Sequence, residues 1–387
     1  MSGVNTGVAN GVIHMSKRIL RADHVGSLLR TENIKKARKS YYGLNEINRS
    51  ELTEIEDRSI KNLVKIQENV GLRAVTDGEQ RRSFWHYDFM DGLTGMEMVE
   101  RDPGQGVQFA GVKLRPIFPT ITGKIDFPDD HPHLQHFEFL AKHTSVTPKI
   151  SIPGPSCCHF RTAPADILPE EYKDVELLTQ DISLAYKKAV ETFYRNGCRY
   201  LQMDDIFFAY LCDPKHRQSA IENNLDPDYL IQRYAWMMHE AIKDRPNDMT
   251  IAMHMCRGNF RSTHAAEGPY DAVADTVFNQ TGVDVFFMEY DTERAGGLEP
   301  LSFMAKGKQR VLAGFITTKS GTLEDLDWIR RKYDSASKHI GIDQLGIAPQ
   351  CGFASTEEGN TITYDDQSRK LELVVKAADS IWGGVES

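Results

Sequence analysis

The sequence predicts an α/β protein built as a single (β/α)8 TIM barrel. Short runs rich in β-forming residues alternate with longer stretches whose apolar residues recur at three- and four-residue spacing. Parallel neighbours in a sheet need a crossover connection, so this alternation indicates a parallel sheet. The number of strand–helix units favours a closed barrel over an open sheet, and 387 residues accommodate one barrel with insertions.

The expected strands are spread over the whole chain. They cover residues 20–26, 73–77, 147–152, 199–204, 250–255, 283–288, 310–316 and 343–348. The amphipathic helices expected between them include 50–70, 175–196, 227–244, 322–339 and 366–382. The segment 100–146 contains several Pro, Gly and His residues, and it is interpreted as an elaborated loop that covers one mouth of the barrel.

Composition and charge limit the domain organisation and the partners. Residues 1–19 are rich in Gly, Asn and Ser and lack the apolar core of a signal peptide, so we expect a disordered tail followed by one barrel domain over 20–387. No stretch approaches the ~20 apolar residues of a membrane span. A formal net charge of −9 without an evident basic face argues against nucleic acids and anionic membranes as partners. These features favour a cytoplasmic location.

Polar side chains follow the ends of the expected strands. Ser27 and Glu79 come after the first and second strands, Asp204 ends the fourth, and Thr317 to Ser320 come after the seventh. In barrels of this type, reactive groups sit at the carboxyl ends of the strands. We therefore expect these side chains to converge at one mouth, which a purely structural barrel does not need.

Four potential metal ligands share this placement. His254 and Cys256 are two residues apart on one expected strand, so their side chains point to the same face. Glu289 and Cys351 end the sixth and the last apolar runs. Taken singly, each has a plainer interpretation, because a lone buried Cys usually packs as a small hydrophobe and Glu289 could be an ion-paired carboxylate. Two thiolates, an imidazole and a carboxylate together suit tetrahedral Zn²⁺.

Zinc with thiolate ligands suggests a reaction class. Coordination to zinc deprotonates a thiol at neutral pH, and the thiolate is the nucleophilic form. The sequence therefore predicts S-alkylation of a small thiol by an electrophilic carbon.

Several strings along the chain carry a family resemblance: ADHVGSLLR, AVTDGEQRRSFWHYDF, YLQMDD, MHMCRGNFR, FFMEYD and APQCGFASTEEGN. Over roughly residues 20 to 383 the sequence resembles the short, stand-alone bacterial relatives of cobalamin-independent methionine synthase. The resemblance implies one catalytic barrel that methylates homocysteine to methionine. It also implies Zn²⁺ bound by His254, Cys256, Glu289 and Cys351, which agrees with the set found from the strand ends.

The same resemblance implies homocysteine contacts at Ser27, Glu79 and Asp204, and we expect His24 and Gly26 of the first string to contribute to this site. Two carboxylates can hold a substrate ammonium, and a Ser with nearby backbone amides can hold a carboxylate. Glu79 and Asp204 could alternatively pair with the arginines at positions 81, 82 or 199. Asp205 points to the other face of its strand, and a structural role suits it better.

The chain departs from the long methionine synthases after the seventh strand. Those enzymes carry a His there that is thought to relay a proton, whereas this segment reads FITTKSGTLE. Lys319, Thr318 and Ser320 are the candidates to take its place. The methyl donor therefore stays open between a methylated folate and another methyl source.

Three other functions compete with this prediction. The first is alkyl transfer to a different thiol such as coenzyme M, although Glu79 and Asp204 favour a thiol that carries an ammonium. The second is a metal-free decarboxylase resembling uroporphyrinogen decarboxylase, which would leave His254, Cys256 and Cys351 without a role. The third is a zinc-storing or regulatory protein with a closed zinc site, but such sites normally hold neighbouring loops together rather than lie in a barrel mouth.

Overall fold

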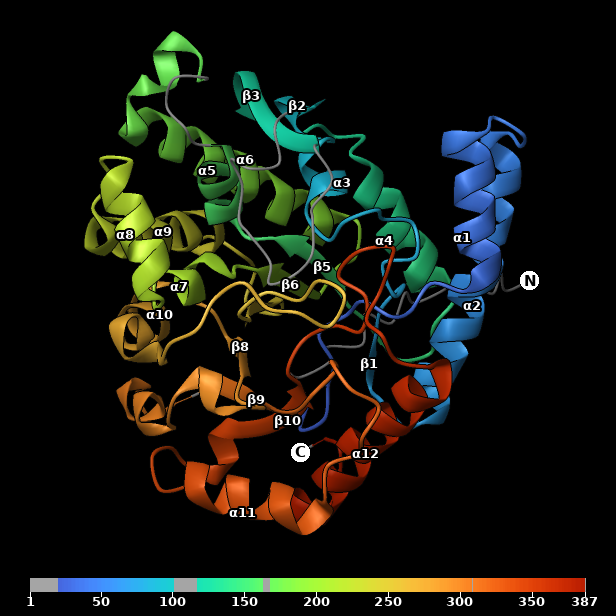
Figure 1. Cartoon of the computed structure of the whole chain (residues 1–387), viewed down its shortest axis with the longest axis vertical. Helices are drawn as coiled ribbons and strands as arrows, with labels where there is room; N and C mark the ends of the chain where they lie inside the picture. Colours follow the sequence, from blue (N-terminus) through green and yellow to red (C-terminus); the bar gives the residue numbers. More distant parts are fainter. Residues whose placement is uncertain (1–19, 101–116, 163–167, 308, 387) are drawn as a thin grey trace, which may run out of the picture.

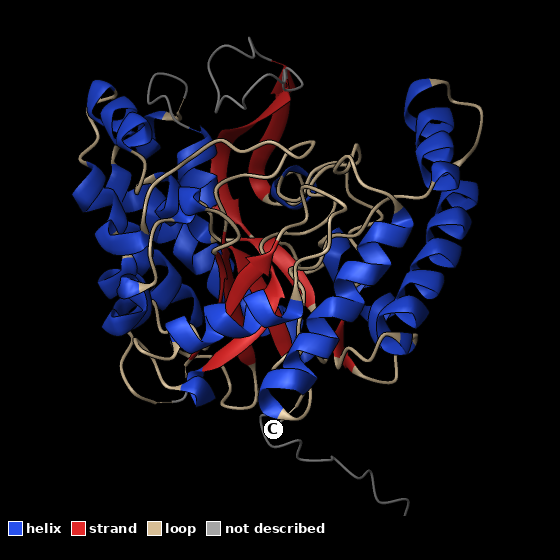
Figure 2. Ribbon diagram, turned by 60° about the horizontal axis from the view of Figure 1, so that its bottom comes forward, coloured by secondary structure: helices blue, strands red, loops and turns tan. Residues whose placement is uncertain are grey.

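Parallel strands form the centre of the molecule, and helices surround them (Figures 1 and 2). This computed structural model describes residues 20–100, 117–162, 168–307 and 309–386. Six strands form one parallel sheet in the order β10-β9-β8-β7-β6-β5. Their bounds are Ile150–Pro153 (β5), Tyr200–Asp204 (β6), Thr250–Met255 (β7), Val285–Glu289 (β8), Arg310–Ile316 (β9) and Leu345–Pro349 (β10). Strands that follow one another in sequence lie side by side, as in a (β/α)8 barrel.

Contacts at the two edges of this sheet close the circle. β1 (Ala74–Val75) pairs in parallel with β4 (Thr147–Pro148), which leads directly into β5. At the opposite edge, Ala22 forms a parallel bridge with Ile347 of β10. The Thr76 hydroxyl donates a hydrogen bond to the Gly26 carbonyl oxygen at 2.6 Å and joins the first strand position to the second. The predicted barrel is confirmed, although residues 20–26 form isolated bridges rather than a regular strand.

Helices connect the strands on the outside of the barrel. The longer ones are α2 (Arg49–Asn69), α4 (Pro132–Lys142), α6 (Val175–Arg195), α9 (Pro227–Ile242), α11 (Leu326–Ala336) and α12 (Tyr364–Trp382). The shorter ones are α1 (Glu32–Arg38), α3 (Tyr87–Met90), α5 (Pro155–Thr162), α7 (Phe207–Tyr210), α8 (Pro214–Glu222) and α10 (Ala274–Gln280). After β8, two short 3-10 helices at 293–295 and 299–303 take the place of the α-helix that follows a strand in a regular barrel.

Local sequence signals set the helix ends. In α2, the Asn48 side chain accepts from the Glu51 backbone and the Glu51 side chain accepts from the Asn48 backbone, which is a capping box. Thr363 and Asp366 repeat this arrangement at the start of α12. The five predicted helices are confirmed, but α11 begins only at Leu326, because the Asp325 side chain caps it by accepting from the Trp328 backbone.

The loop predicted at 100–146 is only partly present. β2 (Thr94–Glu100) and β3 (Ile117–Asp126) form an antiparallel hairpin, and α4 is the barrel helix that follows β1. The loop interpretation is therefore wrong for residues 117–126 and 132–142. The Pro and His residues had suggested a loop. Pro132, however, occupies the first turn of α4, where proline is tolerated. Residues 101–116 and the predicted tail at 1–19 lie outside the described residues.

The barrel has an apolar interior and an apolar outer layer. The interior holds Leu20, Val25, Ala74, Tyr200, Ala252, Val285, Phe287, Leu312 and Ala348. Lys149 is also buried there, and its ammonium lies 2.8 Å from Oδ1 of Asp23 and 4.6 Å from the centre of the Phe287 ring. A larger cluster packs the helices against the sheet. Among the described residues, no helix is both long and apolar enough to cross a membrane.

Candidate active site

Three of the four predicted metal ligands lie together at the carboxyl ends of the strands. His254 is in β7, Cys256 follows the last residue of β7, and Cys351 follows β10 by two residues. One ligand atom from each lies within 4.8 Å of the others, and all three side chains are buried. Among the described residues, this is the group of His, Cys, Asp and Glu side chains close enough to hold a metal ion.

The two thiols are electrostatically unequal. A hydrogen bond with Cys256 and the nearby His254 imidazole hold the pKa of Cys351 well below its usual range. The same hydrogen bond, together with burial, raises the pKa of Cys256. The hydrogen bond between the two sulfurs thus lowers the pKa of one thiol and raises the pKa of the other, as expected of two groups that share one proton.

Glu289 lies outside this group of three. Its Oε1 accepts from Nη2 of Arg294 at 2.7 Å, and its Oε2 accepts from the backbone N–H of Arg257 at 3.1 Å. Burial raises the pKa of Glu289, but the Lys319, Arg294 and Arg257 charges outweigh it and lower the pKa overall. Glu289 is therefore an ionised carboxylate that holds the residue following Cys256.

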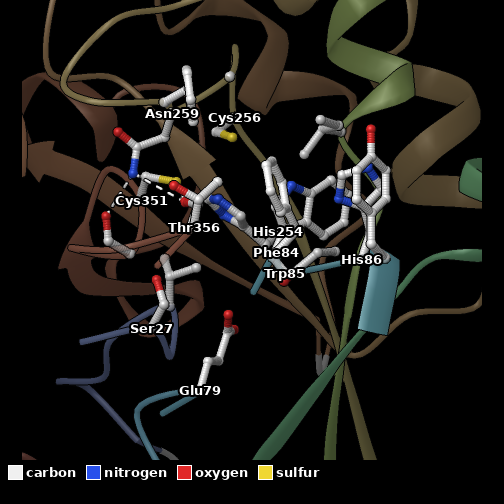
Figure 3. Close-up of a pocket in the computed structure, with 18 residues that line it drawn as sticks. Ser27, Glu79, Phe84, Trp85, His86, His254, Cys256, Asn259, Cys351 and Thr356 are labelled. Carbon is white, nitrogen blue, oxygen red and sulfur yellow. Dashed lines mark hydrogen bonds between the residues drawn. The ribbon is translucent and has the colours of Figure 1, made fainter. Parts of the chain in front are cut away.

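A pocket opens beside the cluster, with a volume of about 640 Å³ that includes space open to solvent. Ser27, Glu79 and Asp204 line it, together with His254, Cys256 and Cys351. In Figure 3, Ser27 and Glu79 lie on one side of His254 and the two sulfur atoms on another. The structure thus brings together the three predicted homocysteine contacts and the three clustered metal ligands.

Both carboxylates in this pocket are poorly solvated. Burial raises the pKa of Asp204 to about 7, although the His254 imidazole opposes the shift. Burial also raises the pKa of Glu79, against the opposing Arg82 and Arg30 charges. Among the described residues, Oε2 of Glu79 is buried without a hydrogen-bond partner. A carboxylate oxygen left in this state is suited to a ligand that donates hydrogen bonds.

Ser27 is held against the loop that follows β10. The Ser27 hydroxyl accepts from the Ala354 backbone N–H at 3.3 Å, and the Ser27 carbonyl oxygen accepts from the Phe353 N–H at 2.9 Å. A Cβ atom on Gly352 would lie 1.9 Å from the Ser27 hydroxyl oxygen. Any side chain at position 352 would therefore displace the Ser27 hydroxyl from its present position.

Two further predicted substrate residues do not line the pocket. His24 is buried, and burial lowers its pKa to about 3, so that its ring is neutral. Gly26 has a φ of +137°, a conformation that favours glycine, and its carbonyl oxygen accepts from Thr76. Both shape the turn that carries Ser27. The structure does not place them where they would contact a substrate.

The three residues considered for proton transfer also lie outside the lining. The Thr318 hydroxyl donates to Oε1 of Gln350 at 2.7 Å. The Lys319 ammonium donates to the Gly258 and Thr263 carbonyl oxygens and to Oδ1 of Asn259, at 2.9 to 3.1 Å. Ser320 is exposed. Lys319 is thus engaged in fixing the loop after Cys256, and none of the three faces the pocket.

The largest feature that the sequence did not predict is an aromatic wall. We use this term for Phe84, Trp85, His86, Tyr87 and Phe260, which all line the pocket. Phe84 stacks on Tyr87 with ring centres 4.8 Å apart, and the Phe260 ring is nearly parallel to it at 6.4 Å. The run SFWHY, which begins four residues after Glu79, was a visible signal, because four consecutive aromatic side chains follow a predicted site residue closely.

The comparisons with known proteins agree with this geometry. The family model for the catalytic domain of cobalamin-independent synthase matches residues 20–380. The chain belongs to this family. It is 42% identical to the uncharacterized protein YxjG of Bacillus subtilis, over 99% of this chain and 100% of that protein.

Two other relatives carry more specific names. A solved structure from Listeria monocytogenes, provisionally assigned as a vitamin-B12-independent methionine synthase, has a TM-score of 0.75 and 38% identity, covering 94% of this chain and 98% of that one. The 5-methyltetrahydropteroyltriglutamate–homocysteine methyltransferase of Listeria welshimeri is 21% identical over 91% of this chain, which matches 42% of that enzyme. The family membership confirms the resemblance inferred from the sequence strings and supports a methyltransferase with a thiol substrate and a methyl donor.

Proposed function

We propose that this chain is a zinc-dependent thiol S-methyltransferase that converts homocysteine to methionine. The observation that carries the proposal is the meeting of two sites in one pocket. His254, Cys256 and Cys351 lie within 4.8 Å of one another, and Glu79 and Asp204 line the same pocket. A group that activates sulfur and a group that binds ammonium are what an amino-acid thiol requires.

The three clustered residues fit zinc. Two sulfurs and one imidazole nitrogen, all buried, are ligands that zinc prefers, and three protein ligands leave a position for an exchangeable one. When bound, zinc lowers the pKa of a coordinated thiol, so that the sulfur is held as the nucleophilic thiolate. The carboxylate of Glu289 supports the backbone next to Cys256 and so keeps this thiol in place.

The other pocket residues divide the recognition of the amino acid between them. Glu79 offers an unpaired oxygen and Asp204 a second carboxylate, and both suit a substrate ammonium. The Ser27 hydroxyl suits the substrate carboxylate. Ionisation of Asp204 on binding an ammonium would reverse the effect of burial on its pKa, because an adjacent positive charge stabilises the carboxylate. The name of the Listeria welshimeri relative, a homocysteine methyltransferase, supports the same thiol.

Thiol selectivity tests the proposal. Zinc-loaded protein is titrated calorimetrically with homocysteine, cysteine and coenzyme M, each in two buffers, so that the protons released by thiol ionisation can be counted. We expect homocysteine to bind most tightly and to release protons. Coenzyme M has no ammonium for Glu79 and Asp204, so tighter binding of coenzyme M would reject homocysteine in favour of the other alkyl transfer.

A further inference from the structure

We infer that the methyl donor is a small methylated onium compound, a sulfonium or a quaternary ammonium, held against the aromatic wall. This inference rests on the proposed function, since it concerns the second substrate of the same pocket. Three features of the described residues carry it: the aromatic wall itself, the charge of the pocket lining, and the placement of proton donors.

The aromatic wall lies next to the sulfur cluster. The Trp85 backbone N–H donates to the Ser355 carbonyl oxygen at 2.9 Å, and Phe84 forms an antiparallel bridge with Thr356. These contacts fasten the wall to the loop that begins at Cys351. Figure 3 shows Phe84 and Trp85 beside His254, on the side away from Cys351 and Ser27. A donor on this wall would be close to the sulfurs without occupying the place of the amino acid.

The lining is suited to a cation. Its described residues contain no Lys or Arg side chain that would repel a cation, and the carboxylates Glu79 and Asp204 balance the charge of the homocysteine ammonium beside it. Trp85 is half-buried and keeps part of its surface accessible, while Phe84 and Phe260 stack nearly parallel. Aromatic faces attract cationic methyl groups, with Trp the strongest. A folate donor, by contrast, brings glutamate carboxylates that would meet no cationic side chain among these residues.

The bond changes also favour an onium donor. Transfer from a sulfonium breaks one carbon–sulfur bond, whose electron pair stays on the donor sulfur and leaves a neutral thioether. The new carbon–sulfur bond takes its pair from the homocysteine thiolate, and no proton moves. Transfer from a tertiary amine needs a proton at the leaving nitrogen. Thr318, Lys319 and Ser320, the residues considered for that task, do not line the pocket. Because methyl transfer from an onium donor needs no proton, it can proceed although these three residues lie outside the pocket lining.

Methyl-labelled donors test the inference. Zinc-loaded protein with saturating homocysteine is given S-methylmethionine, dimethylsulfonioacetate or glycine betaine, and in parallel 5-methyltetrahydrofolate, its triglutamate and methylcobalamin. Labelled methionine is measured by mass spectrometry. We expect kcat/KM for at least one onium donor to exceed that of every other donor at least tenfold. A higher kcat/KM for a folate or for methylcobalamin overturns the inference and leaves the proposed function standing.

Variants of the aromatic wall give a second readout. Trp85→Leu and Phe84→Leu should raise KM for the onium donor between about 2-fold and about 30-fold, the range for loss of a cation–π contact. KM for homocysteine should stay within twofold, and Phe84→Tyr, which keeps the ring, should behave like the unchanged protein. An unchanged donor KM in both Leu variants overturns the inference. If no donor gives methionine, the inference also fails, and homocysteine binding by calorimetry then decides the proposed function separately.

Discussion

The Lys319 ammonium donates a hydrogen bond to Oδ1 of Asn259 at 3.0 Å. The Asn259 amide in turn donates to the Gly352 carbonyl oxygen at 2.8 Å and to the Ser355 hydroxyl at 3.1 Å. Cys256 precedes Asn259 in one loop, and Cys351 precedes Gly352 in the other. Lys319 and Asn259 thus join the two loops that carry the paired sulfurs. We propose that Lys319, the residue first considered as a proton donor, instead positions these two loops.

Lys319→Ala should weaken zinc binding without abolishing it. Loss of residues that orient metal ligands typically lowers metal affinity by about 10- to 100-fold, and we expect this range in a competition titration with a chelator. Lys338→Ala is the matched control, since Lys338 is exposed. Equal zinc affinity in the Lys319 variant and the control would show that the loops keep their positions without this bridge.

Asp204 and Asp205 form a matched pair for separating recognition from folding. Asp204→Asn should weaken homocysteine binding by about 1.5–3 kcal/mol, typical of a lost charge-assisted hydrogen bond, while zinc stays bound. Asp205 instead accepts a hydrogen bond from the Ser156 hydroxyl and is fully buried. Asp205→Asn should therefore lower the free energy of unfolding and leave homocysteine affinity nearly unchanged. Calorimetry and urea unfolding of both variants check this, and the opposite pattern would exchange the two roles.

Gly352→Ala should displace Ser27. The added methyl group would lie 1.9 Å from the Ser27 hydroxyl oxygen, so this hydroxyl must rotate away from its present position. Overpacking of this kind typically costs about 1–3 kcal/mol of stability, and we expect homocysteine affinity to fall at least tenfold as well. Gly307→Ala is the control, because nothing lies within 4 Å of a Cβ at that position. Unchanged homocysteine affinity in the Gly352 variant would remove Ser27 from the binding site.

His133 should make the fold sensitive to acid. Burial, with the Arg82 charge and neighbouring histidines, holds its pKa well below the usual range, so its ring is neutral in the folded chain. The unfolded chain binds this proton near pH 6.5. The contribution of the neutral His133 ring to the free energy of unfolding is therefore fully present above pH 6.5. Below that pH it is lost by about 1.4 kcal/mol per pH unit for one proton.

Replacement of His133 by Leu removes this titration. His133→Leu should lose less unfolding free energy between pH 7.5 and pH 5 than the unchanged protein, as measured by urea unfolding at both pH values. His143→Leu serves as control, because His143 is exposed near the end of the same helix. Parallel losses in the His133 variant and the unchanged protein would contradict a neutral buried ring.

The barrel and much of the site followed from the sequence because strand ends have a fixed meaning in this fold. Residues two apart on a strand share a face, so His254 and Cys256 could be paired from spacing alone. A second rule places Cys351 and Asp204, because the parallel strands of a barrel end at one mouth. The convergence of Ser27 and Glu79 on this pocket is a consequence of the same geometry.

These rules cannot predict which side chains of different loops contact one another. The pairing of Glu289 with Arg294 depends on a turn after β8, and the engagement of Lys319 depends on the loop after Cys256. Neither loop has a periodic pattern that fixes its path. The aromatic wall was missed for a related reason: Phe260 is far from Phe84 in sequence, and only the folded loops place their rings 6.4 Å apart.

The most direct test of the account is zinc-edge X-ray absorption on the purified protein before and after addition of homocysteine. We predict bound zinc with two sulfur ligands, rising to three when homocysteine is added. In Cys256→Ser and Cys351→Ser zinc should be lost or bound with fewer sulfurs, whereas Cys198→Ser, in a thiol remote from the pocket, should bind zinc normally. Full zinc occupancy with unchanged sulfur ligation in both Cys256→Ser and Cys351→Ser, or a sulfur count that homocysteine does not change, would contradict the account.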